Sequence, residues 1–221
     1  ALVRDGGTLQ VGIGELGDAL VYPLLLRHQQ NAVYRDALQG LGSERSAALI
    51  DREGGRDPFG AGLFASTEMF IDQILDLYRV GILRRRVYDS LPLERLLASG
   101  EVTERFDEHL LEKLATVGVG PQLSAEEFER LQYFGVFRRD IEFDEGRMRA
   151  AGEKWVEADL SSPTARARIA ETCMGRELRN GQVLHAGFFL GPRGFYAALR
   201  ELPENERAQF GMRGVGYVNQ L

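Results

Sequence analysis

The chemistry that this sequence could support begins with a carboxylate, Glu68, in the segment 65–70. The apolar residues 63–65 just before it predict a short buried strand, and Thr67 is a residue type that caps helices. Glu68 would then lie in the first turn of the following helix. The positive end of a helix macrodipole keeps a carboxylate ionised, as a nucleophile must be. The same dipole favours glutamate in any first helical turn, so a purely structural role stays open.

A second candidate is the glycine segment 12–17, which has the spacing GxGxxG. It joins residues 8–14, whose alternation predicts a strand, to a helix-compatible run from residue 18 to about residue 31. Backbone amides at Gly12 and Gly14 could bind an anionic oxygen. Dinucleotide binding is disfavoured, because Asp36 lies in a helical or loop context rather than at the end of a second strand. The glycines could also serve only a tight turn and close helix packing.

Other reactive residue types are sparse. The three histidines, His28, His109 and His185, have no metal-ligand spacing among themselves or with Cys173, so we predict no metal site. His185 lies in a buried-looking strand and is a weak candidate for a site residue. No GxSxG or GxxxxGK motif is present, and nothing near Cys173 would activate its thiol.

The elements that must position these residues alternate between strand and helix. Beyond the first two strand–helix units, which are separated by an irregular region at 40–62, a buried strand at 183–190 leads to a helix from 192 to about 202 and a further strand at 211–218. This order predicts an α/β fold with an open, mainly parallel sheet and helices on both faces. Ligands on such sheets bind beyond the carboxyl ends of the strands.

Residues 91–180 differ in character and predict a mixed helical and hairpin insertion between core segments 1–90 and 181–221. Ser124 and Glu127 have capping-box spacing, and the turn at 144–146 joins two predicted hairpin strands. A further helix should start at Pro163 and stop at Asn180-Gly181.

Composition limits the classes of function. The chain has 221 residues, 44% of them hydrophobic, which is enough for a substantial core, and its net charge of −6 disfavours nucleic-acid binding. The sequence shows neither a signal-peptide pattern nor an apolar run long enough to cross a bilayer, so no membrane role is expected. Its single cysteine fits a reducing cytoplasm.

Three segments together resemble the acetyl-CoA hydrolase/transferase family, whose members are family I CoA-transferase-like enzymes. They are DGGTLQVGIGELGDAL at 5–20, STEMFIDQILDLYRVGIL at 66–83 and LHAGFFLGPRGFYAALRELP at 184–203. The first is similar to that family's glycine loop before an Asp-Ala pair, and the second to its TExxxD segment. The third resembles a subgroup with an extra segment between the core motifs. The resemblance implies the NagB/RpiA/CoA-transferase-like fold and touches nearly the whole chain.

The resemblance also implies a reaction. Glu68 would be the catalytic residue, attacking an acyl-CoA thioester and passing through a glutamyl-CoA thioester that a carboxylic acid or water resolves. Gly12 and Gly14 would bind the oxyanion or CoA, with Asp18 and Asp72 in supporting positions. Coenzyme A enters as a substrate thioester, and no permanently bound cofactor is expected. The sequence also allows a homodimer.

Two expectations accompany this assignment. Members of that family continue beyond the segment at 219–221 into a second glycine-rich loop and carry an N-terminal domain, so this stretch alone should fold but turn over little or no substrate. The alternative from another class is a non-enzymatic α/β ligand-binding or assembly module. In that case Glu68 would only stabilise a helix, and the insertion would supply a partner surface.

Overall fold

The structure is a computed structural model that describes residues 1–12 and 14–218, with the side chain of Asp18 left undescribed. The chain divides into two compact units. Unit 1 comprises Ala1–Val87 together with the segment from Gln182 onward, and unit 2 comprises Tyr88–Gly181. Each unit has its own cluster of buried apolar side chains. The segment predicted as an insertion at 91–180 falls within unit 2.

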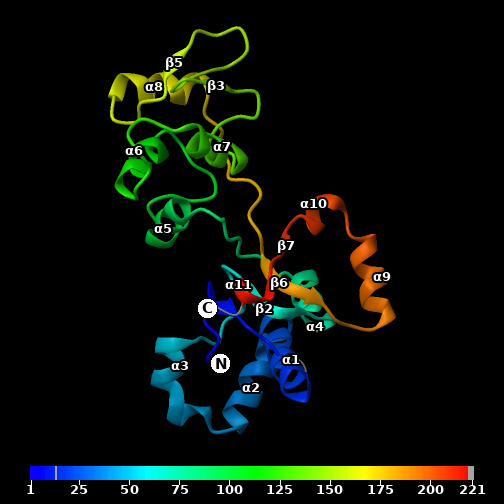
Figure 1. Ribbon diagram of the computed structural model, residues 1–221. Coiled ribbons are helices and arrows are strands. Elements are labelled where there is room, and N and C mark those ends of the chain that lie inside the picture. Colours follow the sequence, from blue (N-terminus) through cyan, green and yellow to red (C-terminus); the bar gives the residue numbers. More distant parts are fainter. Residues whose placement is uncertain (13, 219–221) are drawn as a thin grey trace. The chain divides into compact units, whose positions relative to one another are not determined.

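Unit 1 is an α/β unit built on a four-stranded parallel sheet (Figure 1). The strand order is β1-β2-β6-β7, and every neighbouring pair is parallel. The strands are β1 (Thr8–Leu9), β2 (Phe64–Phe70), β6 (Leu184–Phe189) and β7 (Phe210–Met212). β2 and β6 are therefore the central strands, and the α/β class with a parallel sheet predicted from the alternation is confirmed.

Helices flank this sheet. The strand residues Ala65, Leu184 and Ala186 share one apolar cluster with residues of α1 (Glu15–Gln29) and α4 (Asp72–Arg79). The short α11 (Val215–Val218) contacts both β2 and β6. The remaining helices of unit 1 are α2 (Asn31–Gly40), the 3₁₀ turn η1 (Ser43–Ser46), α3 (Ala47–Glu53), α9 (Arg193–Glu201) and α10 (Glu204–Arg207).

Four local predictions for unit 1 are wrong. The strand expected at residues 8–14 covers only Thr8–Leu9 in the described part of the chain. The irregular region expected at 40–62 contains η1 and α3. The strand expected at 63–65 extends to Phe70, so the following helix starts only at Asp72. The strand expected at 211–218 is a short strand followed by a helical turn. In the last two cases pairing and packing between distant segments override the local pattern.

The chain enters and leaves unit 2 at one place on unit 1. Val87 and Gln182 form an antiparallel bridge in which each backbone N–H donates to the other residue's carbonyl, at 2.8 and 2.9 Å. This pair lies before β6 and closes the chain on itself around Tyr88–Gly181.

Unit 2 combines four helices and a three-stranded antiparallel sheet of order β3-β4-β5. The helices are α5 (Leu91–Ser99), α6 (His109–Thr116), α7 (Ala125–Tyr133) and α8 (Pro163–Thr172); the strands are β3 (Glu142–Asp144), β4 (Arg147–Arg149) and β5 (Val156–Glu157). The helix predicted to run from Pro163 to Asn180 is shorter than expected, because α8 ends at Thr172.

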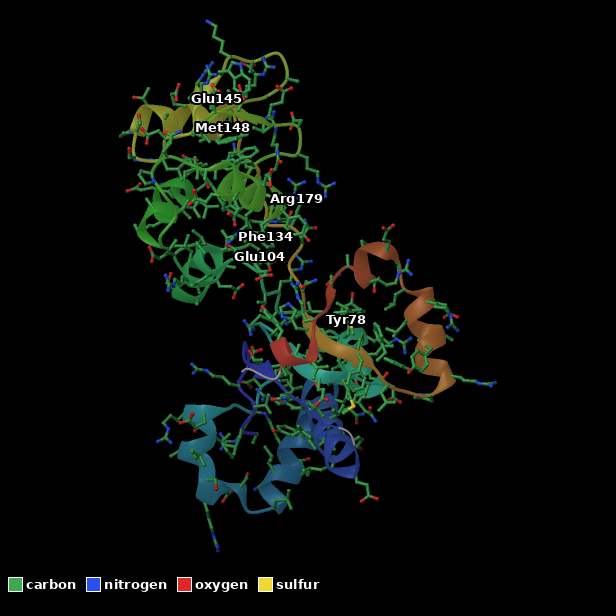
Figure 2. All side chains as sticks on the ribbon, in the orientation of Figure 1. Tyr78, Glu104, Phe134, Glu145, Met148 and Arg179 are labelled. Carbon is green, nitrogen blue, oxygen red and sulfur yellow. The ribbon has the colours of Figure 1, made fainter. Side chains whose placement is uncertain are left out.

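Two predictions for unit 2 are confirmed. Ser124 Oγ accepts a hydrogen bond from the Glu127 amide at 3.2 Å, and Glu127 Oε2 accepts from the Ser124 amide at 2.9 Å, which completes the capping box. The hairpin turns at Glu145 and Gly146, both with positive φ, as a tight turn requires. Met148, on the following strand, is fully buried (Figure 2).

The carboxylate of Asp5 holds the segment before β1 against the segment before β2. Asp5, just before β1, accepts hydrogen bonds from the backbone amides of Gly60, Ala61 and Gly62, at 2.8 to 2.9 Å, and from that of Gly6 at 3.1 Å. Partial burial alone would raise the pKa of this carboxyl, but the four N–H donors outweigh it and hold the pKa below its usual value.

We expect Asp5→Asn to lower the free energy of unfolding of unit 1 by about 1–2 kcal/mol at pH 7, because an amide NH₂ would face donors. Since the folded pKa is depressed, the stabilisation is present above the ordinary pKa and is lost as pH falls through the folded value. Urea unfolding at several pH values should therefore show the wild type and the variant converging as the pH falls through the lowered pKa of Asp5. A difference that is independent of pH would contradict this role for the carboxylate.

Candidate functional site

Glu68 lies near the carboxyl end of β2, one of the two central strands of the parallel sheet, and is partly buried. The prediction that it occupies the first turn of a helix is wrong. Residues 68–70 remain in the strand because Met69 and Phe70 pair in register with Phe188 and Phe189 of β6. The expectation that it lies at the carboxyl end of a strand is confirmed, and this is the end at which parallel sheets bind ligands.

Because Glu68 lies in a strand rather than in a helix, its electrostatic surroundings differ from those predicted. Thr67 does not cap α4; the N-cap position is Ile71, and Asp72 is the acidic residue in the first turn. The stabilisation that a helix N-terminus gives to a carboxylate therefore applies to Asp72 rather than to Glu68. Asp72 is partly exposed and follows the strand directly, and Asp18 lies in the first turns of α1.

The glycine segment lies beside the strand that carries Glu68. β1 pairs with β2 through Thr8 with Phe64 and Leu9 with Ala65. Further along, the buried Thr67 hydroxyl donates to the Val11 carbonyl at 2.9 Å. This bond joins the residue just before Glu68 to the residue just before Gly12. The glycine segment and the carboxyl end of β2, both singled out from the sequence, are therefore in contact.

The glycines of this segment have different roles. Gly14 is the N-cap residue of α1 and has φ of 106°, a conformation that side chains disfavour. A Cβ on Gly17 would fall 2.3 Å from the Gly12 carbonyl oxygen, so only glycine permits the first turn of α1 to fold against the loop. Gly12 and Gly14 are exposed. Ile13 lies outside the described residues.

Sequence reasoning missed that a short helix, α11, packs on β6, the strand next to β2. A Cβ on Gly187 of β6 would fall 3.0 Å from the Glu68 carbonyl oxygen and 2.9 Å from Val215 Cγ2. Gly187 therefore lets α11 approach the sheet next to Glu68. The signal lay in the tripeptide His-Ala-Gly within a strand, since an isolated strand glycine often marks a close approach of another segment.

His185, also on β6, is held by a hydrogen bond and by ring packing. It is 6% exposed, and its Nε2 lies 3.0 Å from Gln182 Oε1, which also accepts a hydrogen bond from Arg213 Nη2 at 3.0 Å. Its ring contacts Phe64 edge-on, with ring centroids 5.1 Å apart. Ser66, the β2 residue in register with it, is on the same face as Glu68 because side chains alternate along a strand.

This arrangement combines a partly buried carboxylate, a neighbouring loop of exposed glycine backbone, and the start of a long helix. A carboxylate so placed can act as a nucleophile or a base, and loop amides can stabilise negative charge that develops nearby. Within residues 1–12 and 14–218, no group of three histidine, cysteine, aspartate or glutamate side chains is arranged to hold a metal ion.

The comparisons with known proteins identify no family. No family model matches the chain, and neither a curated protein nor a solved structure matches it at a significant level. None of the helices in the described part of the chain has the length and apolar character needed to cross a membrane.

Proposed function

We propose that this chain is part of an acyl-CoA hydrolase or CoA-transferase that acts on acetyl-CoA or a similar short acyl-CoA, with Glu68 as the nucleophile. The observation that carries the proposal is the hydrogen bond from Thr67 Oγ1 to the Val11 carbonyl, at 2.9 Å. It holds the glycine loop against the strand end that presents Glu68. A covalent acyl transfer needs a nucleophile and oxyanion donors close together, and this bond supports such a pairing.

The reaction would have two exchanges. The Glu68 carboxylate attacks the thioester carbonyl, and the C–S bond breaks. CoA thiolate departs, and an acyl-glutamyl anhydride is formed. The thiolate then attacks the glutamyl carbonyl of the anhydride, releasing the acid and forming a glutamyl-CoA thioester. Water hydrolyses this thioester, or a second carboxylate reverses the sequence to form a new acyl-CoA. No redox step occurs, and the carboxylate is regenerated.

The glycine loop would supply the electrostatic part of catalysis. Each addition to a carbonyl places negative charge on its oxygen, and backbone amides at Gly12 and Gly14 are the proposed donors. One such preorganised donor can contribute about 3 kcal/mol to transition-state stabilisation. The N-terminus of α1, which begins at Glu15 directly after Gly14, adds a positive dipole end at the same edge of the sheet. Asp18 and Asp72 are proposed as supporting residues.

The same proposal covers the finer fold assignment. The parallel sheet with its flanking helices is compatible with a NagB/RpiA/CoA-transferase-like unit in which Tyr88–Gly181 is the insertion. The partners would be an acyl-CoA and a small carboxylate or water, in a cytoplasmic setting.

An acceptor experiment tests the function. The intact protein should be incubated with acetyl-CoA, with and without propionate, and the CoA species separated by liquid chromatography. A transferase forms propionyl-CoA, because propionate resolves the glutamyl-CoA thioester, whereas a hydrolase releases free CoA in both mixtures. Unchanged acetyl-CoA together with no measurable CoA binding would reject the proposal and favour the non-enzymatic ligand-binding or assembly module.

A further inference from the structure

A pocket of unit 1 lies away from Glu68 and is rich in arginine. It has a volume of about 470 Å³, within the range of about 300–1,000 Å³ that small-molecule sites occupy. The charged residues among those that line it are Arg79, Arg84, Arg86 and Glu206. The lining thus contains three arginines and one glutamate, in a chain whose net charge is −6.

The pocket lies toward the amino ends of the strands. Tyr78 and Arg79 are the last residues of α4, which begins just after the carboxyl end of β2. Leu83, also in the lining, forms a parallel bridge with Leu63, just before the first residue of β2. Gln209, on the other wall, comes directly before β7. The pocket and Glu68 thus lie toward opposite ends of the central strand.

Arg84 is held in place by carbonyl oxygens. Its Nη2 donates to the Phe59 carbonyl at 2.7 Å and also to the Gly60 carbonyl. Its side chain packs so closely on the backbone that a Cβ on Gly62 would fall 2.3 Å from Arg84 Cγ. Neutral carbonyls orient the Arg84 guanidinium without neutralising its positive charge.

Arg79 has a weak acidic partner. Its Nη1 lies 3.9 Å from Asp76 Oδ1, beyond hydrogen-bonding distance, and half of its side-chain surface is exposed. A surface pair of this kind contributes little free energy, so the guanidinium can turn toward another anion at small cost.

Glu206, the one carboxylate among the described residues of the pocket lining, accepts a hydrogen bond from a tyrosine. The hydroxyl of Tyr78, which Figure 2 labels, donates to Glu206 Oε2 at 3.2 Å, and the Tyr78 ring packs edge-on against Phe210. Burial and the neighbouring Glu206 charge raise the pKa of Tyr78 to about 12, while Arg86 opposes the rise. The phenol is therefore a neutral hydrogen-bond donor at any physiological pH.

Most carbonyl groups at the C-terminal end of α4 already accept hydrogen bonds from the following loop. The Asp76, Leu77 and Tyr78 carbonyls accept hydrogen bonds from the amides of residues 80–83. Gly81, with φ of 78°, makes this reversal possible. Three of the last four carbonyls of α4 are thus bonded internally, which reduces the partial negative charge at this helix end.

We propose that this pocket binds a small, multiply charged anion of the diphosphate class. Planar guanidinium groups match phosphate oxygens through paired hydrogen bonds, and several of them around one pocket favour an anion with more than one charge. The diphosphate could be the free inorganic ion or part of a nucleoside diphosphate. The site is separate from the proposed acyl-transfer site, so it does not depend on that function.

Calorimetric titration of the full chain with inorganic pyrophosphate, at constant ionic strength, tests the proposal. We expect saturable binding that Arg79→Gln weakens about tenfold, because one charge-assisted contact is lost. Glu206→Gln should tighten binding roughly threefold, since it removes the opposing charge and keeps an oxygen acceptor for Tyr78. Arg200→Gln, at an exposed arginine of α9, is the matched control and should change affinity less than about twofold.

The two pocket variants are expected to change the affinity for pyrophosphate in opposite directions, which a general loss of folding would not do. Should Arg79→Gln fail to fold, as judged by circular dichroism, the direction of the Glu206→Gln effect decides. Titration with ADP distinguishes the sources: tighter binding than pyrophosphate indicates a nucleotide, and equal binding indicates recognition of the diphosphate alone. Absence of pyrophosphate binding, equal weakening by Arg200→Gln, or weaker binding to Glu206→Gln would overturn the assignment. Glu68→Gln should leave this binding intact.

Discussion

Replacing Glu68 by glutamine is expected to abolish the covalent CoA adduct that the proposed reaction with acetyl-CoA would form. The adduct is a glutamyl-CoA thioester, whose mass exceeds that of the protein by one CoA less one water. Glutamine has nearly the same shape but no carboxylate oxygen to attack the thioester, so turnover should fall by roughly three orders of magnitude or more. Intact-protein mass spectrometry after brief incubation with acetyl-CoA measures the adduct directly.

The control for this variant is Glu201→Gln, which changes an exposed glutamate at the end of α9. Adduct yield and turnover should match the wild type, because Glu201 lies on a different element from the candidate site. Peptide mapping of the wild-type adduct should place the added mass on the peptide containing Glu68. An adduct of unchanged yield in Glu68→Gln, or one mapped to another peptide, would remove Glu68 from the mechanism.

The largest effect on stability is expected from Phe70→Ala. Phe70 ends β2, is fully buried, and contacts the rings of Phe189, Phe195 and Phe210 at centroid distances of 5.8, 5.4 and 5.0 Å. Its side chain therefore joins β2 to β6, α9 and β7. Truncation leaves a cavity among rings that cannot all collapse, and about 3–5 kcal/mol of unfolding free energy should be lost. Typical domains have only about 5–15 kcal/mol in total.

Phe189→Ala is the matched control, since Phe189 belongs to the same aromatic group but is 41% exposed. We expect it to cost about 1–2 kcal/mol, in proportion to the smaller apolar area it buries. Urea unfolding should be followed by probes in both units, because two separate cores permit two transitions. Phe70→Ala should shift the transition of unit 1. Equal losses for the two variants would show that Phe70 is not the centre of this group.

The sequence predicts the class of fold because the signals that specify it are local. Strand–helix alternation indicates a parallel sheet, the Ser124–Glu127 spacing gives the capping box, and the residues 144–146 give the hairpin turn. Each of these depends on residues a few positions apart. The segment from Thr67 to Phe70 misleads for a physical reason: a threonine followed by a glutamate suits a helix start, but pairing with β6 keeps it extended.

The candidate site is predictable in part. The glycine segment and Glu68 could be paired in advance, because adjacent strand–helix units place strand ends at one edge of a sheet. The contact that joins them, from Thr67 to Val11, needed the register of β1 on β2, which no local pattern contains. The same holds for α11: residues 211–218 predict a strand, yet Val215–Val218 form a helical turn against β2 and β6. The arginine pocket likewise joins α4 to the segment before β7.

The bridge between Val87 and Gln182 bears on the order of folding. The pairing of β2 with β6 joins residues on opposite sides of Tyr88–Gly181, and closing so long a loop in an unfolded chain has a high entropic cost. Once unit 2 has formed its own core and the bridge has closed, the effective separation of the two strands shrinks to the segment from α4 to Val87. Because folding rates fall as contacts become more distant in sequence, the parallel sheet should assemble faster when unit 2 forms first.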